Sequence, residues 1–161
     1  MYSIHAMCDY IVARCAESGT HIDMLKLQKL LYYCQAWNLA YGRGRLFNET
    51  FQAWIHGPVS RTIYDRFAKK AMYSPITIND LSGQAFTIKP EDEQLICSVL
   101  STYAQFTGDQ LEYLTHTEAP WLEARQGLNP DQRSENIISD EIMEKFYRQR
   151  LVNTLSSNTQ S

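Results

Sequence analysis

Apolar side chains recur every three or four positions along most of the chain, which is the period of an α-helix. The first such stretch, residues 4–17, lies between the capping residue Ser3 and Gly19. A second stretch, residues 23–41, begins at the capping residue Asp23 and is apolar over most of its circumference. A helix of that kind is usually the central one of a bundle. The pattern therefore predicts a buried central helix at about 23–41.

Later parts of the chain predict further helices and a small β element. The helices are expected to begin at or just after Ser60, Pro90, Thr107, Thr117 and Ser139 or Asp140. Strand-like patterns occupy residues 51–55, 76–78 and 85–89. The expected fold class is mainly α: a compact single-domain helical bundle around the central helix, with a minor short β element. We place this domain at residues 1–150 and expect residues 151–161 to form a disordered C-terminal tail.

Composition and charge narrow the function classes. The 161 residues carry 15 basic and 18 acidic side chains, which gives a formal net charge of -3. Because proteins that mainly bind nucleic acid are normally basic, DNA or RNA is disfavoured as the principal partner. No apolar run approaches the roughly 20 residues of a membrane span, and the N-terminus lacks the basic segment of a signal peptide. We therefore expect a cytoplasmic protein without membrane attachment.

The cysteines are expected to be reduced thiols. Cys8 and Cys15 lie two helical turns apart, a separation of about 10 Å that exceeds disulfide reach. Cys34 lies in the apolar stripe of the central helix, where a thiol is inert. Cys97 completes no C-x-x-C motif. We expect no metal and no cofactor.

Two histidines and one glutamate are the candidates for acid–base or metal chemistry. His56 precedes Gly57-Pro58, whereas His116 and Glu118 lie at the end of a predicted helix. These three side chains could act in a cleft if the fold brought them together. The simpler interpretation is that His116 interacts with a helix C-terminus and that His56 belongs to a turn. The common catalytic fingerprints, such as a P-loop or G-x-S-x-G, are missing, and we expect no catalytic residues.

Basic and aromatic residues are interleaved near the central helix and the first strand. Lys26, Lys29 and Tyr32 lie in the helix, and Trp54 alternates onto the face opposite Phe51. Such residues line nucleic-acid grooves, although lysines on helix surfaces are more commonly only solvated. Two interpretations of Trp54 stay open: it lines a groove, or it packs in a second core layer.

Three blocks of sequence are more specific than any single residue. They are LKLQKLLYYCQAWNLA at 25–40, RLFNETFQAWIHGPVSRTIYDRF at 45–67 and LEYLTHTEAPWLEAR at 111–125. In order and spacing these blocks resemble the Panacea, or SocA-like, antitoxin domain, which is also described as a phage-associated protein. The resemblance extends from about residue 5 to residue 147. The sequence departs from the family pattern at two positions: Cys34 replaces a more usual alanine, and His56 stands where an aromatic residue is common. Both departures are mild.

The resemblance implies a prokaryotic or prophage antitoxin, not an enzyme, that neutralises a toxin by direct protein–protein contact. The implied partner is a cognate toxin encoded by an adjacent gene. The mode of neutralisation stays open, and it includes delivery to the proteolysis machinery; the oligomeric state is open as well. The motif matches that are candidates for partner binding are Lys26, Lys29, Tyr32, Trp54, His56, Gly57, Pro58, Tyr64, Thr115, His116, Glu118 and Trp121.

The turn and the helix junction within these motifs are expected to meet. Gly57 and Pro58 fix the backbone at a turn, and residues 115–121 join two short helices. We predict that these two segments lie near each other and form a shaped surface with aromatic walls, which suits a loop or helix of a partner.

Two other function classes are kept as alternatives. One is a hydrolase- or transferase-like enzyme that uses His56, His116 and Glu118 in a cleft. It predicts that these side chains lie within hydrogen-bond reach of one another and have perturbed pKa values. The other is a nucleic-acid-binding regulator, which predicts strongly salt-dependent binding to DNA.

Overall fold

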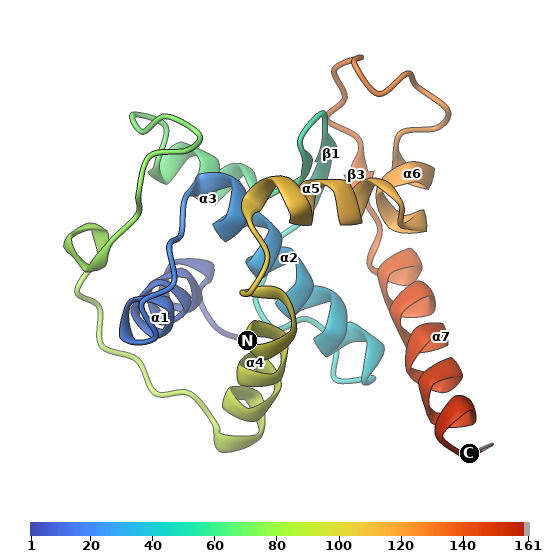
Figure 1. Cartoon of the computed structure of the whole chain (residues 1–161), viewed down its shortest axis with the longest axis horizontal. Coiled ribbons are helices and arrows are strands. Elements are labelled where there is room, and N and C mark those ends of the chain that lie inside the picture. The colour runs from blue at the N-terminus through green and yellow to red at the C-terminus, as the bar shows by residue number, and fades with distance from the viewer. Residues whose placement is uncertain (160–161) are drawn as a thin grey trace.

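One helix lies in the middle of the molecule, and most other elements pack around it (Figure 1). The structure is a computed structural model that describes residues 1–159. Within them the elements in chain order are α1 (Ile4–Glu17), α2 (Met24–Ala40), β1 (Phe51–Trp54), β2 (Gly57–Val59), α3 (Arg61–Arg66), the 3-10 helix η1 (Ile78–Asp80), α4 (Pro90–Tyr103), α5 (Gly108–His116), α6 (Ala119–Ala124), β3 (Ile137–Ile138) and α7 (Asp140–Thr159). This mainly helical domain with a small sheet confirms the predicted fold class.

Helix α2 is the central element that its apolar circumference predicts. Asp23 caps the N-terminus by accepting a hydrogen bond from the backbone N–H of Lys26 at 2.9 Å. Every residue from Met24 to Ala36 is buried, because α1, α4, α5, α7 and β2 all contact this helix. Figure 1 shows α4 and α7 on opposite sides of the C-terminal half of α2.

Two glutamines of α2 hold the segments that flank the β hairpin. Gln28 donates to the carbonyl of Ser60 at 3.0 Å and accepts from its N–H at 2.8 Å. Gln35, two turns later, accepts from the N–H of Leu46 at 2.8 Å and donates to the carbonyl of Phe47 at 2.9 Å. Buried backbone groups need such partners, because leaving one unpaired costs about as much as losing a hydrogen bond. The hairpin is therefore fixed against α2 at both of its ends.

The sheet is antiparallel, with the strand order β2-β1-β3. In β1 the buried side chains of Phe51 and Ala53 alternate with the half-buried Gln52 and Trp54, which confirms the alternation predicted for this strand. The third strand comes from residues 137–138, a segment too short to give a period-two pattern in the sequence.

The strands predicted at 76–78 and 85–89 do not form. Ile76 donates instead to the carbonyl of Ile22, at 2.9 Å, in the connection between α1 and α2. A turn of 3-10 helix then begins because Thr77 and Asp80 form a capping box. Residues 85–89 have no ladder partner, and the segment is irregular.

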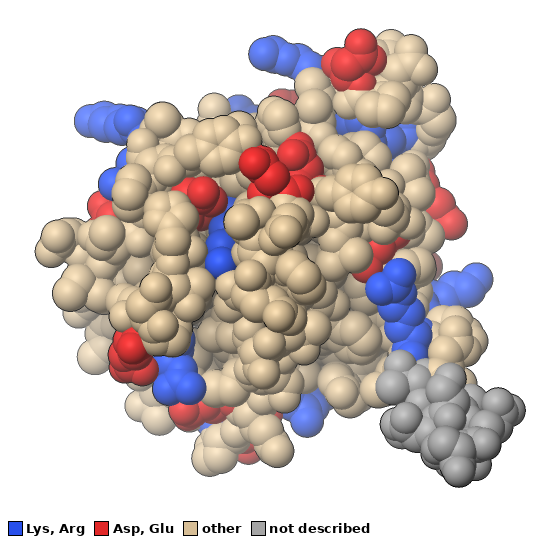
Figure 2. Space-filling view, in the orientation of Figure 1, with Lys and Arg blue, Asp and Glu red and all other residues tan. Residues whose placement is uncertain are grey.

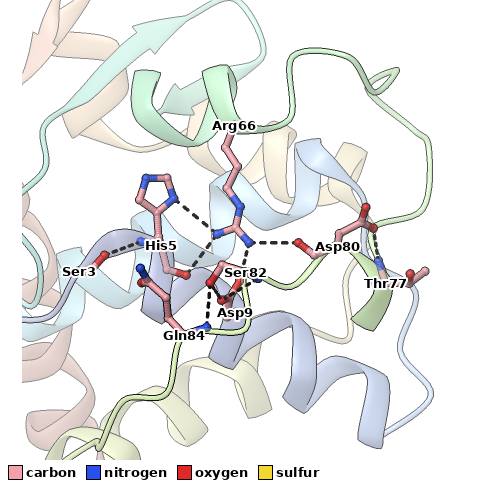
Figure 3. Close-up of polar contacts among 8 residues, drawn as sticks. All are labelled: Ser3, His5, Asp9, Arg66, Thr77, Asp80, Ser82 and Gln84. Carbon is pink, nitrogen blue, oxygen red and sulfur yellow. Dashed lines mark hydrogen bonds and ion pairs between the residues drawn. The ribbon is translucent and has the colours of Figure 1, made fainter.

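The long connection from α3 to α4 is attached to α1 by a cluster of polar contacts (Figure 3). Arg66 forms an ion pair with Asp9, with 2.5 Å between Nη2 and Oδ1, and donates to the carbonyl of Asp80 at 3.1 Å. The other carboxylate oxygen of Asp9 accepts hydrogen bonds from the hydroxyl and the backbone N–H of Ser82. We call Asp9, Arg66 and Ser82 the α1 anchor. It fixes the connection where no regular secondary structure does.

Two helix ends differ from the sequence pattern. The helical pattern that follows Ser60 in the sequence runs to residue 71, but α3 ends at Arg66, whose side chain pairs with Asp9 in the α1 anchor. Thr117 is predicted to begin α6, yet it is the C-terminal cap of α5, where its hydroxyl donates to the carbonyl of Leu114 at 2.7 Å. Glu118 occupies the N-cap position of α6 without a capping hydrogen bond, because its carboxylate is used elsewhere.

Helix α7 reaches into the segment that was expected to be a tail. It begins at Asp140, and the hydroxyl of Ser139 accepts from the N–H of Ile142 at 3.2 Å, as predicted. Its backbone is helical to Thr159. Leu151 still lines a groove against α2, which favours continued helix. Residues 160–161 lie outside the described residues.

Several expectations about chemistry and environment can be compared with the structure. The four cysteines are free thiols, and Cys8, Cys15 and Cys34 are buried, as predicted. Among residues 1–159, no helix combines the length and the apolar character needed to cross a bilayer. Figure 2 shows basic and acidic side chains interspersed on the face in view, without one continuous basic patch.

Candidate functional site

The β1–β2 hairpin places a glycine directly against two other motif residues. Gly57 has a φ of 102°, a region that residues with a Cβ rarely adopt. A Cβ at this position would lie 2.5 Å from Cε of Lys29 and 2.9 Å from Oγ1 of Thr115. Both the backbone conformation and the lack of space therefore require glycine. This contact brings α2, β2 and α5 together.

Lys29 is fully buried beneath the turn, where its Nζ donates to the carbonyl of Pro58 at 3.2 Å. Burial lowers the pKa of Lys29 to about 7, while nearby negative charge, chiefly that of Glu112, opposes this shift. Lys26 is also buried, and its Nζ donates to the carbonyl of Ala104 at the end of α4, at 2.5 Å. The interpretation of these lysines as solvated is therefore wrong: each one satisfies a backbone carbonyl inside the molecule.

The α5–α6 junction lies against the end of β1, which confirms the predicted proximity of the turn and the junction. Trp121 donates from Nε1 to the carbonyl of Trp54 at 2.8 Å. The ring of His116 stacks on Trp121, with 3.8 Å between the ring centroids. Burial lowers the pKa of His116, which favours its neutral form. The histidine is thus a packed aromatic element of the junction.

Glu118 lies in a cluster of tyrosines beneath α7. Its Oε1 accepts hydrogen bonds from the hydroxyls of Tyr33, at 2.7 Å, and Tyr147, at 2.8 Å. Its Oε2 lies 3.1 Å from Nη1 of Arg150. Burial raises the pKa of Glu118, and these hydrogen bonds and the charge of Arg150 counteract the rise. We call Glu118, Tyr33, Tyr147 and Arg150 the α7 junction.

The candidate Tyr32 belongs to the same buried region. Its hydroxyl lies 3.1 Å from that of Tyr147, and its ring packs edge-on against Phe51. Tyr32 is 1% exposed, so it cannot contact a partner in this conformation.

Among the candidates, His56 and Tyr64 are exposed, whereas Trp54 and His116 are half-buried. The rings of Trp54 and Tyr64 meet with 5.0 Å between centroids, and the guanidinium of Arg61 lies over both, at 5.5 and 5.9 Å. His56 pairs with Glu112 of α5. Trp54, His56, Arg61 and Tyr64 line a groove of about 660 Å³, whose far wall is residues 133–135. Of the two interpretations of Trp54, the structure supports the groove.

The structure does not assemble His56, His116 and Glu118 into one centre. Each has its own partner: His56 pairs with Glu112, His116 stacks on Trp121, and Glu118 binds the tyrosine hydroxyls. The mutual hydrogen bonds that the enzyme hypothesis predicts do not occur in the described part of the chain. Over the same residues, no group of three or more His, Cys, Asp or Glu side chains could hold a metal ion.

Sequence reasoning missed the buried residues that complete these contacts. Arg125 is 1% exposed and donates to the carbonyls of Ala53, at 3.0 Å, and Asn129, at 2.9 Å. It thereby ties the segment after α6 to β1. Tyr33 and Tyr147 are the donors to Glu118. Arg125 closes the third sequence block and Tyr33 lies in the first, so membership of a block was the signal that could have identified both.

The fold and the site together define a mainly helical domain in which most motif residues build the interior and a few line one aromatic groove. A sequence model of the antitoxin SocA-like, Panacea domain family matches residues 27–122, and the chain belongs to this family. It is 30% identical over 126 residues to Antitoxin SocA of Caulobacter vibrioides (strain NA1000 / CB15N). That alignment covers 72% of this chain and 66% of the relative, just under two thirds of its length. A search of solved structures gave no match.

Proposed function

We propose that the chain is an antitoxin of a prokaryotic or prophage toxin–antitoxin system and that it neutralises a cognate toxin by direct binding. The observation that carries this proposal is membership of the antitoxin SocA-like family, with a named antitoxin as a relative. The cognate toxin is the product of an adjacent gene, and binding requires no bond to be made or broken in this chain.

The arrangement of the motif residues is consistent with a binding role. Lys29, Thr115 and Glu118 are each at most 1% exposed, so they act by shaping the domain. Trp54 and Tyr64 lie at the surface and present aromatic area, which is the side-chain chemistry enriched in protein–protein contacts.

Co-expression tests this function. Cells that express the toxic product of the adjacent reading frame should recover growth when this chain is co-expressed, and the two purified proteins should elute as one complex. Cells that carry an empty vector in place of this chain are the negative control. If growth does not recover and no complex forms, the proposed function is wrong.

The mode of neutralisation is read from the same cells. If the toxin stays abundant while growth recovers, the chain acts by occupying or holding the toxin. If toxin abundance falls and recovers when ATP-dependent proteases are deleted, the chain acts by delivering the toxin to proteolysis.

The geometry of the site supports neither alternative function. Burial shifts the pKa values of His116 and Glu118, as the enzyme hypothesis predicts, but its three side chains have separate partners. Lys26 and Lys29, the basic residues named for a nucleic-acid groove, are buried, and the neighbouring Arg61 of the Trp54 surface forms ion pairs with Asp65 and Glu135. Absence of a mobility shift on operator DNA at low salt would remove the second alternative.

A further inference from the structure

We infer that the groove between the β1–β2 hairpin, α3 and residues 133–135 is the surface that receives the toxin, and that its occupant is an acidic loop of the toxin. This inference rests on the proposed function and names the face that performs it. We call this surface the Trp54 groove, defined by Trp54, His56, Arg61, Tyr64, Arg133 and Glu135.

The apolar part of the groove is already organised in the free chain. Trp54 is held in one orientation because its Nε1 donates to Oε1 of Gln52 at 2.7 Å. Tyr64 is 41% exposed and packs edge-on against Trp54. Arg61 covers both rings and is itself held by Asp65 and Glu135, at 3.7 and 3.2 Å. A surface that is fixed before binding loses less conformational entropy when a partner docks.

One charged side chain of the groove is left for an acidic occupant. Arg61 shares its charge with Asp65 and Glu135, and His56 pairs with Glu112, whereas the exposed Arg133 forms no ion pair within the described part of the chain. A toxin carboxylate placed beside Arg133 would form a charge-assisted hydrogen bond there. An apolar side chain next to that carboxylate would cover Trp54 and Tyr64. Exposed aromatic residues beside arginine are the residue types that most often dominate binding energy.

Binding measurements with matched variants test this surface. The probe is the purified product of the adjacent reading frame, titrated into the full chain. Tyr64→Ala and Arg133→Glu should each raise Kd by about 30-fold or more, because the first removes an aromatic contact and the second replaces attraction for a toxin carboxylate by repulsion. Tyr41→Ala and Lys145→Glu are the matched controls, since Tyr41 is 50% exposed outside the groove and Lys145 is exposed on α7. Each control should change Kd less than about threefold.

A charge swap tests the acidic occupant directly. Acidic residues of the toxin are changed to lysine one at a time, and each toxin variant is paired with the Arg133→Glu chain. One of them should restore binding to Arg133→Glu while binding the wild-type chain poorly. A structural effect of the mutation could not be rescued in this way. If no lysine variant restores binding, the acidic loop is the wrong occupant.

The outcomes separate this inference from the proposed function. If the wild-type chain does not bind the toxin, both are wrong. If it binds and the groove variants bind equally well, the proposed function stands and the face is wrong. If the chain alone forms a dimer that Tyr64→Ala converts to a monomer, the groove is a contact between two copies, which also overturns the inference. Thermal unfolding of each variant confirms that the fold is intact.

Discussion

The α7 junction and the α1 anchor both bury a carboxylate, but they satisfy it with different partners. In the α7 junction, Glu118 is 1% exposed and accepts from two tyrosine hydroxyls, while Arg150 reaches it with a side chain that is 47% exposed. In the α1 anchor, Asp9 is 8% exposed and faces the guanidinium of Arg66, a side chain that is 14% exposed.

The difference reflects what each cluster has to hold. The α7 junction joins helices that already bury large apolar side chains, including the stacked rings of Tyr33 and Tyr103. Its neutral hydroxyls offset the cost of burying a charge only in part, so the pKa of Glu118 is raised. The α1 anchor holds a connection in which Ile76 is the one buried residue between 68 and 89. There the ion pair adds a charged attachment to the packing of the partly buried Leu81, Phe86 and Ile88.

Removing the carboxylate of the α7 junction should have the largest effect. Glu118→Ala leaves the hydroxyls of Tyr33 and Tyr147 without their acceptor and opens a cavity, so we expect the free energy of unfolding to fall by about 3–4 kcal/mol. Urea denaturation followed by circular dichroism measures it. Glu118→Gln keeps an acceptor oxygen and should cost only about 1 kcal/mol. Equal losses in the two variants would show that the hydrogen bonds are not what stabilises the junction.

The parts of the fold that depend on local signals were predictable from the sequence. The caps Ser3, Asp23 and Thr107 lie within three residues of the backbone N–H groups they bind, so the starts of α1, α2 and α5 can be predicted from short stretches of sequence. The α1 anchor could not be found in this way. Its carboxylate and guanidinium are separated by 57 residues, and no local pattern marks their meeting.

Breaking the α1 anchor should have a smaller and more local effect. Arg66→Met removes the ion pair but leaves the Asp9 carboxylate its hydrogen bonds from Ser82, so we expect a loss of about 2 kcal/mol. Hydrogen exchange should quicken in residues 67–89 while the amides of α2 stay protected. Lys69→Ala, at an exposed position of the same connection, is the control and should change stability by less than about 0.5 kcal/mol. Faster exchange in α2 would mean that the anchor supports the whole fold.

The location of the candidate site could be predicted from the sequence, but the set of residues exposed there could not. The sequence predicts the contact between the β1–β2 turn and the α5–α6 junction. In the structure Gly57 lies against Thr115 with no room for a Cβ. Which motif residues reach solvent depends on which elements cover α2, and a periodic pattern in α2 carries no information about that coverage: the end of α4 lies over Lys26, β2 over Lys29 and α7 over Tyr32. Lys26, Lys29 and Tyr32 were therefore placed among binding candidates although they lie inside.

Lys29 is a third buried charged group, a cation, and like Glu118 it has a neutral hydrogen-bond partner, here the carbonyl of Pro58. Its pKa falls from 10.5 to about 7, so between these values the unfolded chain binds the proton more strongly than the folded chain does. The free energy of unfolding should therefore rise with pH from about 7 upward, by up to about 1.4 kcal/mol per pH unit from this group. Below that range the folded chain carries the full cost of a buried charge.

Replacing this lysine by an apolar residue of similar length isolates that contribution. Lys29→Met should be at least as stable as the wild type at pH 7, because the cost of burying the ammonium disappears. Its unfolding free energy should also vary less between pH 7 and pH 9.5, which urea titrations at four pH values would measure. Lys145→Met, which changes an exposed lysine of α7, should keep the wild-type dependence. If the unfolding free energy of the wild type and of Lys29→Met varied with pH in the same way, Lys29 would keep its ordinary pKa. The carbonyl of Pro58 and the more distant carboxylates would then be enough to stabilise a buried ammonium group.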